Sequence, residues 1–145
     1  MGILHKARLR GMPTYAFVLE VPPNTPITKP KKLTVEVEGR RLDLIRVKWP
    51  GGCLNSVYFA IFYGAHRLFP DVEGEWVTGD NETKEYPVGV DLPKSPCRLQ
   101  LRAYNVSDRW TYKLNVELIT SELLMPTWAA EILTRLRRIE EFLGI

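Results

Sequence analysis

The amino-acid sequence predicts an all-β fold: an antiparallel β-sandwich, jelly-roll-like, with an N-terminal extended arm and one C-terminal α-helix. Three observations lead to this prediction. Apolar and polar residues alternate along eight or nine short segments, turn signals separate these segments at regular intervals, and no helical periodicity appears before residue 122. A jelly roll places eight strands in two sheets, so the number of segments fits that architecture.

The chain has three predicted parts: an arm with a proline-rich connector (1–32), a β-sandwich domain (33–121) and a helix (122–145). The connector holds four prolines between Pro22 and Pro30, which restricts it to extended backbone without strand pairing. Inside the arm, Tyr15–Val21 has the pattern of a strand. We therefore expect the arm to reach beyond the sandwich and touch neighbouring subunits.

Within the sandwich, three segments have distinctive patterns. Apolar residues change parity between Leu44 and Ile45, which predicts a β-bulge at that point. Val57–Tyr63 is apolar on both faces, so it should be a central strand whose outer face is covered by the arm or by a neighbouring subunit. Pro87 has no backbone N–H to donate to a neighbouring strand, so its segment is predicted to lie at a sheet edge.

Two further predictions concern side-chain direction and pairing. Trp76 lies in a short apolar segment and is expected to point inward, as aromatic residues of a sandwich core do. The segments Leu99–Ala103 and Tyr112–Leu118 show the cleanest alternation in the chain and are separated by a turn, so they are expected to pair as a hairpin.

The C-terminal segment carries a heptad pattern. Its apolar residues are spaced 4-3-4-3-4, with leucine at a and isoleucine at d toward its end, which favours assemblies of more than two helices. We therefore predict a coiled coil that joins three or more copies of the chain; the alternative is a helix that packs on its own sandwich. The interface residues are Met125, Ala129, Ile132, Leu136, Ile139 and Leu143.

The length and composition of the chain limit the classes of protein to which it can belong. The 145 residues are 45% hydrophobic and suffice for one domain with a core, while no apolar run is long enough to cross a bilayer. The basic start lacks the apolar region of a signal peptide. A single glutamine beside eleven prolines and 26% charged residues favours a thermophilic source.

No motif for catalysis, a cofactor or a metal occurs. His5 and His66 have no ligand-type partner spacing, and the serine, histidine and acidic residues show no catalytic arrangement. We expect a protein that is not an enzyme. Cys53 and Cys97 fit buried thiols better than a disulfide. Five acidic residues between Asp71 and Glu82 could offer oxygen ligands to a cation, although solvated loop carboxylates are the preferred interpretation.

Charge and aromatic residues suggest partners. Residues 1–48 carry ten Lys or Arg and four Asp or Glu, whereas residues 49–95 carry three and seven. A basic arm could therefore attract an acidic middle between subunits, although solvated charged faces are the preferred interpretation. The basic residues lack interleaved aromatic rings, which argues against nucleic acid. Tyr104 and Trp110, beside Asn105, are candidate contacts for a carbohydrate, whereas Trp76 and Tyr112 are assigned to the core.

Five stretches in the middle of the chain, about residues 33–120, carry a family resemblance: Val47–Cys53, Phe69-Pro70, Trp76–Asp80, Arg102–Asn105 and Asp108. In these stretches the chain resembles small β-sandwich virion proteins of bacterial and archaeal viruses. The resemblance implies a capsid, decoration, turret or spike subunit, located in the virion, whose partners are further copies and other structural proteins. A carbohydrate-binding or adhesion module, cytoplasmic or on a cell surface, is the alternative.

Overall fold

The computed structural model describes residues 13–122, which form nine β-strands. The predicted coiled-coil residues, the basic start of the arm and His5 lie outside these residues. In chain order the strands are β1 (Thr14–Val21), β2 (Lys31–Val37), β3 (Arg41–Trp49), β4 (Val57–Tyr63), β5 (His66–Phe69), β6 (Val77–Thr78), β7 (Glu82–Asp91), β8 (Cys97–Asn105) and β9 (Tyr112–Ser121).

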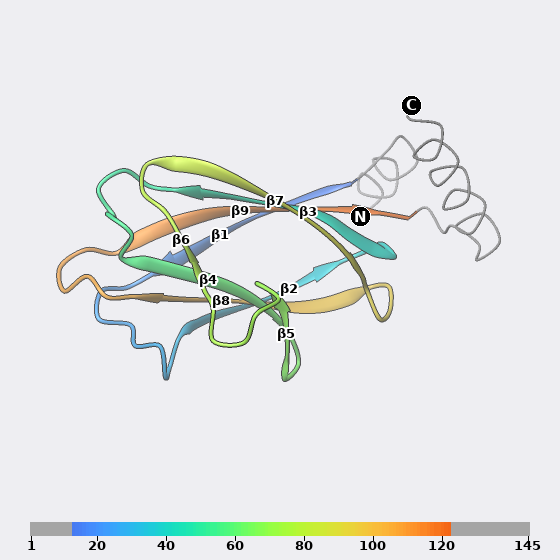
Figure 1. The fold of residues 1–145 in the computed structure, drawn as a ribbon, viewed down its shortest axis with the longest axis horizontal. Helices are drawn as coiled ribbons and strands as arrows, with labels where there is room; N and C mark the ends of the chain where they lie inside the picture. The colour runs from blue at the N-terminus through green and yellow to red at the C-terminus, as the bar shows by residue number, and fades with distance from the viewer. Residues whose placement is uncertain (1–12, 123–145) are drawn as a thin grey trace, which may run out of the picture.

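The described strands form two antiparallel sheets. One has the order β1-β9-β3-β7, and the other has the order β2-β8-β4-β5, with β6 paired to β4 (Figure 1). The pairing is nested: β1 pairs with β9, β2 with β8, β3 with β7 and β4 with β5. The fold therefore resembles one long hairpin wound over itself, with strands from both halves of the chain in each sheet.

The core lies between the two sheets, as the period-two patterns predict. The four-stranded sheet contributes side chains such as Trp49 and Leu118, and the five-stranded sheet contributes Phe59 and Leu101, all at most 1% exposed. This confirms the prediction of a β-sandwich. Cys53 and Cys97 are buried free thiols, and burial raises the pKa of both, which keeps them in the unreactive protonated form.

Several local predictions are confirmed. The register of β3 against both of its neighbours shifts between Leu42 and Leu44, so the bulge lies within two residues of its expected position. Strand β7, which contains Pro87, is an edge strand. The central position of β4 is also confirmed, because it pairs with β8 on one side and with β5 and β6 on the other.

Other predictions need correction. β8 and β9 do not form a hairpin, because the turn between them carries the chain from one sheet to the other. The sandwich begins at Thr14 rather than residue 33, since β1 pairs with β9 along its whole length. Alternation reports which face of a strand is buried, but it does not report which strand lies beside it.

The outer face of β4 is covered from within the chain. Ala60 is fully buried and Phe62 is 9% exposed, with Trp76 and the guanidinium groups of Arg67 and Arg102 packed against the Phe62 ring. No neighbouring subunit or arm is needed to cover this strand, so the expectation of an external cover was wrong. Trp76 lies in this outer cluster and does not point into the core.

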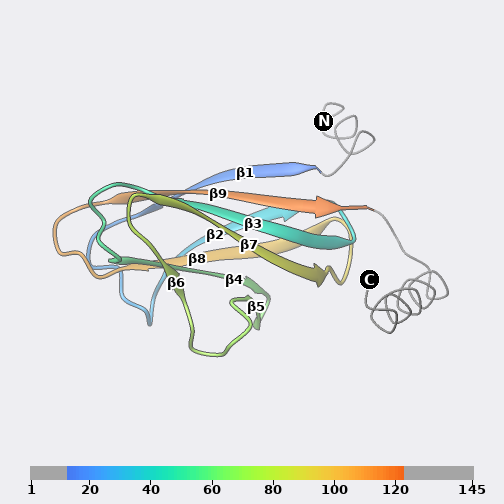
Figure 2. The ribbon, with the colours of Figure 1, turned by 45° about the horizontal axis from the view of Figure 1, so that its top comes forward.

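The two ends of the sandwich differ (Figures 1 and 2). At one end, β1 begins and β9 finishes as neighbouring strands, since Thr14 pairs with Ile119. At the opposite end, four connections lie together: β1–β2, β3–β4, β6–β7 and β8–β9. We refer to these as the terminal end and the loop end.

Candidate functional site

The loops of the loop end are joined to one another by hydrogen bonds. The amide of Val106 donates to the carbonyl of Ser56 at 2.9 Å, and that of Asn24 donates to the carbonyl of Ser107 at 2.8 Å. The Tyr112 hydroxyl donates to the carbonyl of Gly52 at 3.1 Å. Loops cross-linked in this way present their side chains in fixed positions, as a binding surface requires.

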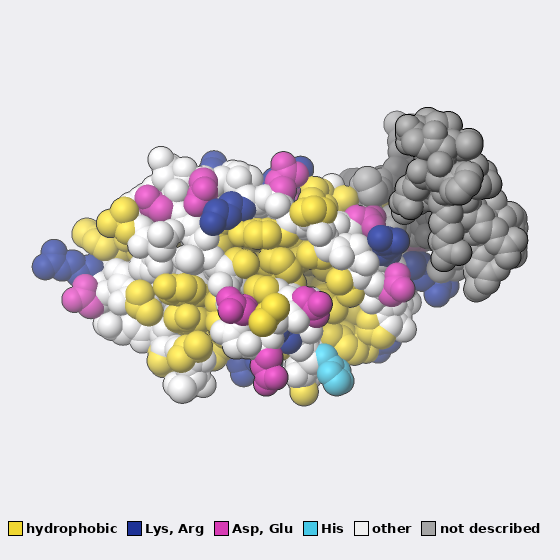
Figure 3. Space-filling view, in the orientation of Figure 1, with side chains coloured by type: hydrophobic (Ala, Val, Ile, Leu, Met, Phe, Trp, Pro, Cys, Tyr) yellow, Lys and Arg dark blue, Asp and Glu magenta, His cyan; other side chains and the backbone are white. Residues whose placement is uncertain are grey.

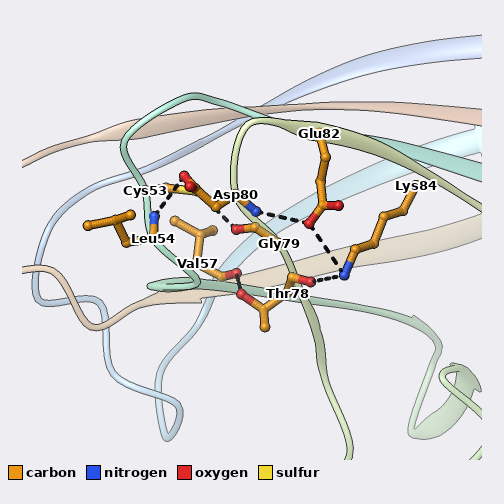
Figure 4. A network of polar contacts seen from close by, with 8 residues as sticks. All are labelled: Cys53, Leu54, Val57, Thr78, Gly79, Asp80, Glu82 and Lys84. Carbon is orange, nitrogen blue, oxygen red and sulfur yellow. Dashed lines mark hydrogen bonds and ion pairs between the residues drawn. The ribbon is translucent and has the colours of Figure 1, made fainter.

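A polar network fixes the β3–β4 loop (Figure 4). Asp80 accepts a hydrogen bond from the Leu54 amide at 3.0 Å, and the Gly79 carbonyl accepts one from the Cys53 thiol at 3.1 Å. Glu82 in turn accepts a bond from the Asp80 amide at 3.2 Å and lies 3.6 Å from the Lys84 ammonium. Asp80 and Glu82 therefore organise a turn.

Exposed hydrophobic side chains gather at the loop end. The structure describes six large hydrophobic residues that are at least half exposed, and four of them lie on these loops. Leu54 is 75% exposed, Val106 62%, Trp110 61% and Ile27 50%. Exposed apolar groups that share one end of a fold provide a candidate contact site, whereas those scattered singly over a surface are ordinary.

Leu54 also has an unusual backbone conformation. Its φ is +49°, in the left-handed region that a leucine rarely adopts because its Cβ approaches the following carbonyl. The neighbouring left-handed positions are occupied by Gly52 and Asn55, which tolerate this conformation. Because the Leu54 side chain is 75% exposed, burial does not offset the cost of this conformation, and Leu54 is a candidate contact residue.

Replacing Leu54 with asparagine is therefore expected to raise the free energy of unfolding by about 1 kcal/mol, since asparagine tolerates left-handed backbone. Chemical denaturation measures the change. Leu54→Ala is the matched control, because alanine removes the apolar side chain but keeps the Cβ and its strain. An equal gain in both variants would contradict a backbone origin.

A second surface lies on the outer face of the five-stranded sheet. Tyr58 and Tyr104, opposite each other on β4 and β8, stack with centroids 4.6 Å apart, and Trp76 meets Tyr104 edge-on at 4.9 Å. The Phe62 ring lies 6.2 Å from Trp76. We call these four residues the outer aromatic cluster.

Two arginines pack on the outer aromatic cluster. The guanidinium carbon of Arg102 lies 3.9 Å from the Phe62 centroid, and that of Arg67 lies 5.0 Å from the same centroid and 5.5 Å from that of Trp76. Such contacts are cation–π interactions. Desolvation, and then the nearby positive charge of Arg67, lower the pKa of Arg102.

The predicted ligand contacts do not form one site. Trp110 is exposed at the loop end, whereas Tyr104 belongs to the outer aromatic cluster. Asn105 is 1% exposed, and its amide group donates to the carbonyls of Val21 and Trp110 while accepting from the Ser107 amide. The side-chain amide of Asn105 already makes three hydrogen bonds within the chain, so Asn105 is a structural residue and not a ligand contact. The half-buried Tyr112 packs against the core, as predicted.

Sequence reasoning missed Leu54, Arg67 and Arg102. The two arginines gave no local signal, because Arg67 reaches Phe62 only through the pairing of β5 with β4. Leu54 did give a signal, since an apolar residue two positions after Pro50-Gly51-Gly52 falls in a turn rather than in a strand.

The described residues provide neither a metal site nor a membrane-spanning helix. Within residues 13–122, no three histidine, cysteine or acidic residues lie close enough to share a metal ion. No helix among the described residues could span a membrane.

Figure 3 shows hydrophobic side chains along the middle of one face and acidic ones over the β5–β6 loop. A hollow of about 380 Å³ beside this loop is lined by Phe62, Ala65, His66, Arg67, Asp71 and Glu73.

Comparisons with known proteins add no functional information. No family model matches the chain, and no curated protein matches it. Among solved structures, the crystal structure of FlhE is similar over 74% of this chain and 97% of that chain, with 9% identity and a TM-score of 0.35. A likeness at that TM-score carries no argument, so function must be argued from the surfaces described above.

Proposed function

We propose that the protein is a non-enzymatic structural subunit of a larger assembly, a virion component such as a capsid, decoration, turret or spike protein. Its fold would be a jelly roll, an architecture used by viral capsid domains and lectins. The nested pairing from β1·β9 inward to β4·β5 supports that assignment, with β6 as an addition.

The observation that carries the proposal is the difference between the two ends of the sandwich. The strands that lead to the flanking segments leave side by side at the terminal end. The exposed apolar side chains, led by Leu54 and Trp110, lie on hydrogen-bonded loops at the opposite end. This arrangement suits a subunit that is attached at one end and makes contacts with the other.

In this proposal the heptad residues at the C-terminus hold the copies together. Replacing Leu136, at a central a position, with aspartate is expected to reduce the assembly to single chains, because a buried charge in the seam has no partner. Light scattering measures the mass. Thr134→Asp, at the outermost f position, is the matched control and should leave the mass unchanged; dissociation by both variants would contradict a heptad seam.

Carbohydrate binding is the second candidate, because the Trp110 ring is 61% exposed on a fixed turn. Exposed aromatic rings provide flat apolar faces of the kind that sugar rings pack against. A glycan array is expected to show binding of neutral glycans that Trp110→Ala removes. Neutral-glycan binding that survives in Trp110→Ala, or no neutral-glycan binding at all, would reject this site.

A further inference from the structure

Arg67 and Arg102 form a concentration of positive charge, and no carboxylate is ion-paired with either of them within the described residues. They are less than 9 Å apart, since 5.0 and 3.9 Å separate their guanidinium carbons from the same Phe62 centroid. Their hydrogen bonds go to neutral oxygens, the carbonyl of Glu75 and the side-chain amide of Gln100. Among residues 13–122, neither arginine forms an ion pair.

Other arginines on the sheet faces are balanced. Arg46, on the opposite sheet, bonds both Glu85 and Glu117 at 3.2 and 3.3 Å. Arg98 lies on the same strand and the same face as Arg102, and its guanidinium is 3.6 Å from Glu36. Among the arginines on the described sheet faces, the lack of an ion pair is therefore specific to the two on the outer aromatic cluster.

Further cationic and neutral polar groups adjoin this pair. Lys32 is opposite Arg102 in the register of β2 with β8, which adds a third positive charge to this face. The hydroxyls of Tyr58 and Tyr104 have no hydrogen-bond partner within the described part of the chain, so they can bond to a ligand. Desolvation and the neighbouring Tyr58 raise the pKa of Tyr104, which keeps its hydroxyl a donor at neutral pH.

We infer that this face binds an acidic saccharide, a sugar that carries a carboxylate or a sulfate. The acid group would lie between Arg67 and Arg102, whose planar guanidinium groups still have donors free and suit the geometry of such oxyanions. The tyrosine hydroxyls would bond to the sugar hydroxyls. The site is separate from Trp110, and binding here does not depend on assembly.

A saccharide fits this face better than a nucleic acid does. Base stacking needs free aromatic faces, but Tyr58 and Tyr104 cover each other and Arg102 covers Phe62. The neighbouring loop carries Asp71 and Glu73, which would repel a continuous polyanion. A saccharide with one acid group on an otherwise neutral chain needs no base stacking and brings no continuous negative charge to the acidic loop.

Calorimetric titration of the full chain tests this inference with four probes: an otherwise neutral oligosaccharide with one uronic-acid residue, one with a single sulfate, a fully neutral one of the same length and a single-stranded oligonucleotide. We expect at least one acidic saccharide to bind roughly tenfold more tightly than the neutral one, with an affinity that falls as salt rises. The two acidic probes distinguish carboxylate from sulfate as the bound group.

Arg67→Gln and Arg102→Gln should each weaken that binding roughly tenfold, as expected for loss of a charge-assisted contact. Arg98→Gln is the matched control and should not change it, nor should Trp110→Ala. Because the two arginines are tested separately, a folding defect in one variant leaves the other as the measurement. Binding of no saccharide, equal binding of the neutral probe, tighter binding of the oligonucleotide, or binding insensitive to Arg67→Gln would overturn the inference.

Discussion

Replacing Gly79 with alanine is expected to lower the free energy of unfolding by about 3 kcal/mol, a large fraction of the stability of a domain of this size. An added Cβ would lie 2.5 Å from Cδ1 and 2.8 Å from Nε1 of Trp49. Trp49 is 1% exposed and surrounded by core residues, so its ring has no free space into which it could move.

The same change would disturb the loop end. The Gly79 carbonyl accepts bonds from the Cys53 thiol and the Asn55 amide, on either side of Leu54. Gly51→Ala is a matched control, because its added Cβ would come no closer than 3.3 Å, to a side-chain oxygen of Asn81. Urea denaturation measures both variants; a loss of stability below about 1 kcal/mol in Gly79→Ala would contradict the tight contact.

The second large effect is expected from Asn105→Asp, which should destabilise the protein by roughly 3 kcal/mol or more at neutral pH. The Asn105 amide nitrogen donates to two carbonyls, at 2.9 and 3.2 Å, and a carboxylate in its place would repel both. The substitution keeps the size of the side chain, so the loss would come from charge and hydrogen bonding alone.

The effect should depend on pH in a defined direction. The folded protein favours the protonated acid at position 105, so the pKa of that group would lie above its unfolded value. The variant should therefore lose stability as pH rises through the unfolded pKa and regain it under acid conditions. The exposed Asn115→Asp is the control and should change little. A stable Asn105→Asp variant would mean that Asn105 is not a structural residue.

Much of the fold could be predicted from the sequence because burial follows a period of two. That rule correctly identified the strands and the bulge before Ile45, and the missing backbone donor of Pro87 correctly placed its strand at a sheet edge. The rule failed where distant pairing decides the structure. The β8 and β9 segments alternate as a hairpin does, yet each is paired with earlier strands in a different sheet.

The candidate sites were less predictable for the same reason. Trp76 was assigned to the core, although the rings of Tyr104 and Phe62 make the outer face as suitable for it. The Arg67–Arg102 pair depends on two strand pairings that no local pattern shows. Asn105, by contrast, was noticed as a polar residue among aromatic ones, but its role as a buried hydrogen-bonding group becomes visible only in the fold.

The most direct test of the central proposal is the mass of the unaltered full chain in solution, measured by light scattering over a series of dilutions. If the protein is a subunit that assembles through its C-terminal heptads, the mass will be at least three times the 16.7 kDa of one chain. A mass of 16.7 kDa at every concentration would contradict the proposal.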